Sequence, residues 1–162
     1  MKQPGELTFK ITAVFFWVSA FFEITSVSAS MPLFGMIVIS PAVMLYHLTY
    51  LVLFTVLGFG LWFAKGWGYY SLWLTTLIYV TDRIQAALNP ELLREFITAQ
   101  LQDHAEALKL LQIDIGFLKQ SGILDFTVWW LQLLAFAMAA CWVGFLGYAH
   151  LRRRYFGLGD AK

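Results

Sequence analysis

The sequence predicts an all-α integral membrane protein, a four-helix bundle with an additional interfacial amphipathic helix between its third and fourth membrane helices. Of its 162 residues, 60% are hydrophobic and only 13% are charged. A water-soluble domain of this size has too little interior to bury so much apolar surface. Four apolar stretches are also long enough to cross a bilayer, which takes about 20 residues.

The four predicted membrane helices cover about residues 7–28, 42–64, 67–87 and 126–150. Each is predicted to be helical because a helix satisfies its own backbone hydrogen bonds inside lipid. The sequence contains no internal repeat and no linker that would divide it. Residues 1–162 are therefore predicted to form a single four-span domain.

The two predicted sides of the membrane carry opposite charge. The side with both termini and the turn after the second helix has seven Lys and Arg residues against two acids, a net charge of +5. The opposite side has four basic residues against eight acids, a net charge of −4. Because Lys and Arg accumulate on the cytoplasmic side, both termini are predicted to be cytoplasmic.

Two connections differ from ordinary loops. Residues 31–41, MPLFGMIVISP, carry no charge, and we expect them to lie in the outer leaflet interface or to enter the protein as a short half-helix. Over about residues 90–121, apolar residues recur at steps of three and four, which predicts one amphipathic interfacial helix. Asn89 is its predicted N-cap and Pro90 its first helical residue.

Four ionisable residues, Glu23, His47, Asp82 and Arg83, are predicted at a similar depth near the outer side of the membrane. At a rise of about 1.5 Å per residue, Glu23 lies about 20 Å, Asp82 about 25 Å and His47 about 27 Å from the cytoplasmic boundary. Asp82 and Arg83 are adjacent, so their side chains point about 100° apart and cannot form a good pair. We expect one of them to face the bundle, with Glu23 or His47 as its partner.

This set of residues has two interpretations. In the first, all four line a small-molecule site for a lipid, a quinone, a proton or a metal ion, with Glu23 and His47 as possible metal ligands. In the second, Glu23 and Arg83 form a structural ion pair. His47 then makes a hydrogen bond at the interface and Asp82 is solvated. His104 could complete a metal site, but a solvated position on a helix face is simpler. The sequence does not identify a cofactor.

Catalytic motifs are absent from the sequence. It has no GxSxG, no HExxH, no phosphate-binding loop and no Cys/His cluster, so no catalytic residue is predicted. The single cysteine, Cys141, excludes an internal disulfide and is interpreted as a small packing residue. No basic surface with interleaved aromatic residues indicates nucleic-acid binding.

These observations favour a non-catalytic accessory or scaffold subunit. It would bind another membrane protein, or a second copy of itself, through the small residues between Ala135 and Gly147 or through the outer amphipathic helix. The alternative is a small-molecule-binding protein or a membrane enzyme with the polar site in the outer leaflet.

In layout alone, the chain resembles the quinone-linked disulfide oxidoreductases of the bacterial inner membrane. Those proteins also have four helices, cytoplasmic ends and a long third-to-fourth loop with an interfacial helix. Their chemistry needs paired periplasmic cysteines, and the corresponding loops here, residues 30–41 and 88–125, contain none. The resemblance is therefore limited to the layout, and the activity does not carry over. The chain is predicted to be an integral protein of a bacterial inner membrane.

Overall fold

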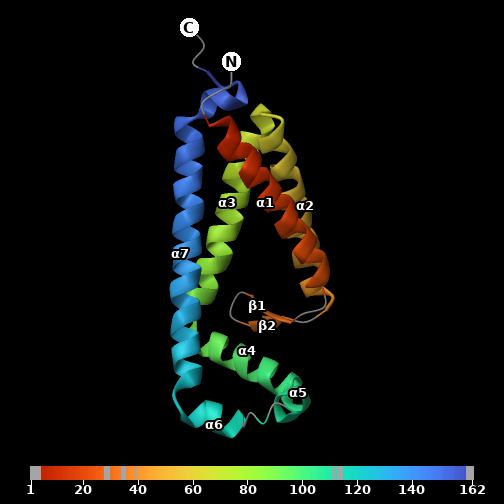
Figure 1. Cartoon of the computed structure of the whole chain (residues 1–162), viewed down its shortest axis with the longest axis vertical. Helices are drawn as coiled ribbons and strands as arrows, with labels where there is room; N and C mark the ends of the chain where they lie inside the picture. The colour runs from red at the N-terminus through yellow and green to blue at the C-terminus, as the bar shows by residue number, and fades with distance from the viewer. Residues whose placement is uncertain are drawn as a thin grey trace. The chain divides into compact units, whose positions relative to one another are not determined.

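The computed structural model describes residues 5–27, 30–33, 36–38, 40–110, 112 and 115–159. Over these residues the chain is almost entirely helical, with seven α-helices, a short 3-10 helix and one two-stranded hairpin (Figure 1). This confirms the predicted all-α class. The chain divides into two compact units. Unit 1 comprises Met1–Ser30, Ile39–Val80 and Ala140–Lys162, and unit 2 comprises Met31–Val38 and Thr81–Ala139.

Four long helices match the predicted membrane segments. They are α1 (Glu6–Thr25), α2 (Ala42–Trp62), α3 (Gly66–Ala87) and α7 (Ile123–Leu151). Among the described helices, α1, α2 and α7 are long and apolar enough to cross a membrane. The Asp82–Arg83 pair, the threonines and the glycines make α3 more polar, and it is not among them. Three potential spans are therefore supported, and the fourth remains a prediction.

Unit 1 has one apolar core, to which α1, α2, α3 and α7 all contribute. On α1 the buried residues Phe9, Ala13, Phe16 and Ala20 recur at steps of three and four, so this helix buries one stripe. The core residues from the other elements are Tyr50, Phe54, Leu57, Leu61, Tyr69, Leu72, Tyr79, Leu146, Ala149, Tyr155 and Phe156. The face of α1 opposite its stripe is also apolar and exposed, as expected for a helix in lipid.

Glycines allow α2 to approach both of its neighbours closely. A Cβ atom at Gly58 would lie 2.4 Å from Nε1 of Trp17, so the indole ring of α1 takes the place of a side chain there. A Cβ atom at Gly60 would lie 2.4 Å from the Cα of Gly68. The backbones of α2 and α3 therefore meet directly at this point, which only glycine permits.

The 3-10 helix η1 (Arg153–Phe156) closes one end of unit 1. Tyr155 and Phe156 are buried, and the Tyr155 ring stacks on Phe9 with a centroid distance of 4.5 Å. The Tyr155 hydroxyl donates a 2.8 Å hydrogen bond to the carbonyl of Leu61, near the C-terminal end of α2. Burial raises the pKa of this hydroxyl above its ordinary value.

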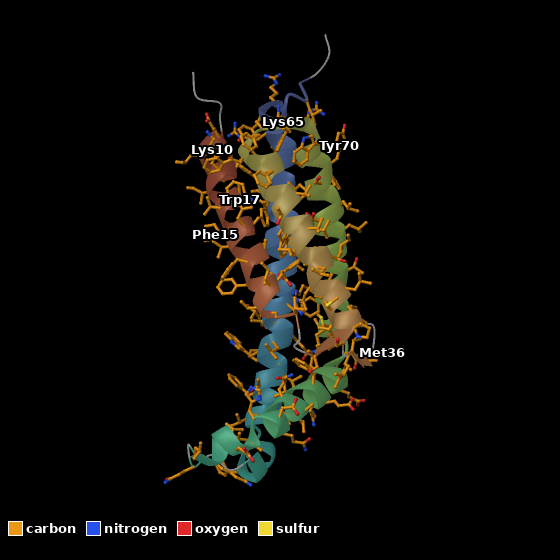
Figure 2. All side chains as sticks on the ribbon, turned by 90° about the vertical axis from the view of Figure 1, so that its right-hand side faces the viewer. Lys10, Phe15, Trp17, Met36, Lys65 and Tyr70 are labelled. Carbon is orange, nitrogen blue, oxygen red and sulfur yellow. The ribbon has the colours of Figure 1, made fainter. Side chains whose placement is uncertain are left out.

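Tyr155→Phe is expected to lower the free energy of unfolding by about 1 kcal/mol, because it removes one buried hydrogen bond and keeps the ring. Equilibrium unfolding in detergent micelles, followed by circular dichroism, would measure the change. Tyr70→Phe is the matched control, since the Tyr70 side chain is exposed on α3 (Figure 2). Equal losses in the two variants would contradict this role for the Tyr155 hydroxyl.

Unit 2 contains a hairpin, three short helices and parts of α3 and α7. The strands β1 (Met31–Leu33) and β2 (Met36–Val38) pair antiparallel, with Met31 opposite Val38 and Leu33 opposite Met36. The half-helix expected as one alternative for residues 31–41 is therefore wrong over the described residues. Pro32 and the β-branched residues of β2 favour an extended backbone over a helix.

The single helix predicted over residues 90–121 is wrong, because this segment forms α4 (Pro90–Asp103), α5 (Ala105–Leu110) and α6 (Ile115–Gln120). Its start is confirmed, since the Asn89 side chain accepts a 3.1 Å hydrogen bond from the Leu92 backbone N–H. His104 leaves the helical conformation, and Gln112 has a positive φ of 57°. Apolar spacing indicates which face is buried, but it does not report where a helix is interrupted.

Candidate functional site

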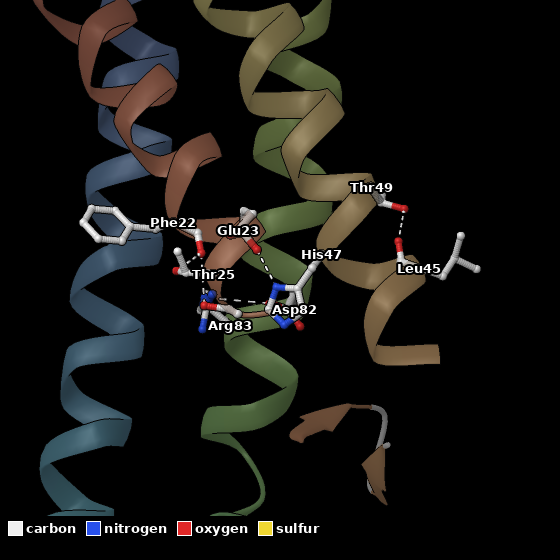
Figure 3. A network of polar contacts seen from close by, with 9 residues as sticks. Phe22, Glu23, Thr25, Leu45, His47, Thr49, Asp82 and Arg83 are labelled. Atoms are coloured by element: carbon white, nitrogen blue, oxygen red, sulfur yellow. Dashed lines mark hydrogen bonds and ion pairs between the residues drawn. The ribbon is translucent and has the colours of Figure 1, made fainter. Parts of the chain in front are cut away.

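Glu23 and His47 form a direct contact between two helices of unit 1. Glu23 lies in the last turn of α1 and His47 in the second turn of α2. The Glu23 Oε2 atom is 2.6 Å from His47 Nδ1, and the two side chains point toward each other in Figure 3. The exposed fractions are 19% for Glu23 and 10% for His47. Such a short contact between a carboxylate and an imidazole is typical of a strong, charge-assisted hydrogen bond.

The other ring nitrogen of His47 has no such partner. Nε2 is buried and makes no hydrogen bond within the described part of the chain. The Tyr46 ring contacts the imidazole edge to face with a centroid distance of 5.3 Å, and Tyr50 lies 4.7 Å from Tyr46. Glu23 therefore orients the imidazole through Nδ1 in aromatic surroundings. Because a buried polar atom without a partner is costly, Nε2 is the position where a proton or a polar ligand atom would be stabilising.

Asp82 and Arg83 lie on the part of α3 that belongs to unit 2. The Arg83 Nε atom is 3.7 Å from Asp82 Oδ2, which is beyond hydrogen-bond distance, as expected for adjacent helix residues (Figure 3). Asp82 is only 7% exposed. The expectation that Asp82 is solvated is therefore wrong.

The structure brings together two of the four predicted site residues, Glu23 and His47. The predicted Glu23–Arg83 ion pair joins residues of different units, and it remains a prediction, as does a site lined by all four residues. In the part of the chain that the structure describes, no three His, Cys, Asp or Glu side chains are grouped closely enough to hold a metal ion. Glu23, His47 and His104 therefore form no such group there.

Three polar features were not predicted from the sequence. In unit 1, the Tyr69 hydroxyl lies 2.8 Å from Nδ1 of His150, a contact between residues 81 positions apart. In unit 2, Arg94 and Asp125 form an exposed 2.6 Å ion pair. Unit 2 also has a groove of about 630 Å³ between β2 and α4. Its lining residues are Ile37, Glu91, Arg94, Glu95, Thr98, Ala99 and Gln102. The spacing of the polar residues on α4 indicated one helix face, but the hairpin that completes the groove gave no comparable signal.

A face of α7 with small residues is not covered by the rest of the described chain. Ala140, Gly144 and Gly147 recur at steps of four and three, and a Cβ atom at either glycine would meet nothing within 4 Å. In the most apolar stretch of α7, only 11% of the residues are buried inside the described chain. The corresponding share is 22% for α1 and 33% for α2. Cys141 is exposed, so its predicted role as a packing residue within the chain is wrong.

No protein-family profile matches this chain, and neither the curated proteins nor the solved structures give a significant match. Two arrangements in the described residues bear on the function. These are the part-buried Glu23–His47 contact and the uncovered small-residue face of α7.

Proposed function

We propose that this chain is a non-catalytic accessory subunit that binds another membrane protein through the α7 face carrying Ala140, Gly144 and Gly147. The uncovered state of this face is the observation that supports the proposal. Helix association in lipid depends on close packing, and small residues let two backbones approach. The glycines of α2 and α3 already make such contacts inside the chain, whereas Gly144 and Gly147 make none with the described residues.

The proposal includes the predicted architecture, a four-helix integral membrane bundle of α1, α2, α3 and α7 in a bacterial inner membrane. The 22-residue α3 is long enough to span, and its contribution to the unit 1 core supports a place among the three more apolar helices. The side with both termini has a net charge of +5 and the opposite side a net charge of −4, which supports cytoplasmic termini. The segment from α4 to α6 is the part proposed to lie at the outer interface.

The α7 contact can be tested by native mass spectrometry of a gentle detergent extract. The 18.5 kDa wild-type chain should be detected in complex with one other membrane polypeptide, in a fixed ratio. Gly144→Leu combined with Gly147→Leu should remove it, because the added side chains separate the two helices. Val52→Leu, which enlarges an exposed residue of α2, should retain it. A complex that survives in the double variant, or a wild-type chain that is always alone, would show that the proposal is wrong.

A second candidate function is a small-molecule site in the outer leaflet around Glu23 and His47. The 2.6 Å contact and the buried Nε2 atom of His47 favour it. The candidate ligands are a lipid, a quinone, a proton and a metal ion. A proton needs the fewest binding groups of these, and a carboxylate–imidazole pair supplies them. Proton exchange at this pair is the chemistry that a membrane enzyme would use.

A further inference from the structure

Basic side chains from separate parts of the sequence gather at one end of unit 1. Arg152, Arg153 and Arg154 follow α7, and Lys65 lies in the turn between α2 and α3; all four are exposed. Figure 1 places the start of α1, this turn and η1 at the same end, and Figure 2 shows Lys10 and Lys65 there. Residues that are distant in sequence therefore form one positively charged surface.

Packing contacts hold this surface in a defined arrangement. A Cβ atom at Gly66 would lie 3.6 Å from the Phe156 carbonyl oxygen, so the turn that carries Lys65 lies beside η1. A Cβ atom at Gly5 would lie 3.7 Å from Cγ of Arg152, so the stem of this arginine lies next to the start of α1. The hydrogen bond from Tyr155 to Leu61 anchors η1 to α2.

Among the described residues of unit 1, little negative charge opposes these cations. Glu6 and Glu23 are the acids in the described residues of unit 1, and Glu23 is in contact with His47. Glu6 lies 2.7 Å from Lys10, which partly neutralises both groups. Trp67 and Tyr70, which follow Lys65 closely in the sequence, both have exposed rings. Exposed aromatic rings beside cations at the end of apolar helices are typical of the headgroup region of a bilayer.

We propose that this surface binds the phosphate headgroup of an acidic phospholipid, with Arg152, Arg154 and Lys65 as the principal cations. A guanidinium can bind phosphate oxygens with two hydrogen bonds, and an ammonium adds a compact charge. The neighbouring tryptophan and tyrosine favour a lipid over a free anion, because they offer surface to the glycerol and the upper acyl chains. This site rests on the membrane location of the chain, but it is independent of the α7 partner.

Competition between two lipids in mixed micelles tests the proposal. Delipidated protein is presented with equal amounts of phosphatidylglycerol and phosphatidylcholine, and the retained lipid is measured by native mass spectrometry. Wild type should retain phosphatidylglycerol preferentially. Arg152→Gln with Arg154→Gln should weaken that binding about 25-fold, and Lys65→Gln about fivefold, because each basic residue near an anionic surface contributes about 1 kcal/mol. Arg94→Gln, an exposed arginine of unit 2, is the matched control and should retain the preference.

The outcomes separate the possible explanations. Equal retention of the two lipids by wild type, or an unchanged preference in both the arginine pair and Lys65→Gln, would overturn the proposal. Inorganic phosphate that binds wild type as tightly as phosphatidylglycerol, in a calorimetric titration, would replace the lipid with a free anion. Lys65 lies in a different element from the arginines, so the Lys65→Gln variant tests the site even if the double arginine variant does not fold. Preferential phosphatidylglycerol binding by a chain that has no protein partner would leave this site intact while the proposed subunit function fails.

Discussion

Gly60→Leu is expected to destabilise the chain by about 3 kcal/mol, because the α2–α3 contact leaves no room for a side chain. A Cβ atom at Gly60 would lie 2.4 Å from the Gly68 Cα and 2.8 Å from Cζ3 of Trp67. The Gly68 atom belongs to the backbone, so rotation of a side chain cannot relieve the overlap. The two helices would have to separate, which would also disturb the neighbouring core residue Leu61.

A graded series makes this prediction specific. Gly144→Leu introduces the same side chain on α7, where nothing lies within 4 Å, and should leave the stability of the isolated chain nearly unchanged. Gly58→Ala should have an intermediate effect, because the obstacle there is the Trp17 ring, which has some freedom to move. Denaturant titration in detergent micelles would rank the three variants. Similar stability for Gly60→Leu and Gly144→Leu would mean that the close α2–α3 contact does not exist.

This comparison shows one limit of what the sequence could predict. The small residues around Gly58 and those around Gly144 have similar spacing in apolar helices, yet one set is filled from inside the chain and the other is open. The number of long helices and the Asn89 cap could be predicted, because length, apolarity and capping chemistry are local properties. Whether a glycine faces a neighbouring backbone depends on a residue far away in the sequence, as Gly68 is for α2.

Periodicity could have predicted more of the candidate site than depth alone. Glu23 follows Ala20 by three residues and so continues the buried stripe of α1, and His47 lies on the buried stripe of α2 between Val43 and Tyr50. Both stripes face the core of unit 1, so a contact between Glu23 and His47 is expected from the periodicity. The depth estimates alone could not choose between His47 and Arg83 as the partner of Glu23. The contact of Tyr69 with His150 left no comparable signal, because neither residue stands out from its apolar or basic neighbours.

His47→Leu is expected to destabilise the chain by about 2–3 kcal/mol. This is the largest expected effect after that of Gly60→Leu. His47→Leu leaves the Glu23 carboxylate without its imidazole partner in a mostly buried position, where an unpaired charge is costly. Glu23→Leu should also destabilise, because Nδ1 of His47 then loses its hydrogen bond. The double variant places two apolar side chains together and should cost clearly less than the sum of the single variants. We expect a coupling of about 0.5–2 kcal/mol, the range of polar contacts between membrane helices.

A second cycle decides which residue is the energetic partner of Glu23. Glu23→Leu is combined with Arg83→Gln, and the coupling is compared with that of the His47 cycle in the same micelles. If the 2.6 Å contact dominates, the His47 cycle gives the larger coupling and the effects of Glu23→Leu and Arg83→Gln nearly add. A larger coupling to Arg83 would instead support the ion pair predicted from the sequence. The two cycles also bear on function, because a purely structural pair must contribute to stability. Single variants that are fully stable, yet alter proton exchange by the reconstituted protein, would make the outer-leaflet site the function of Glu23 and His47 and would displace the subunit proposal.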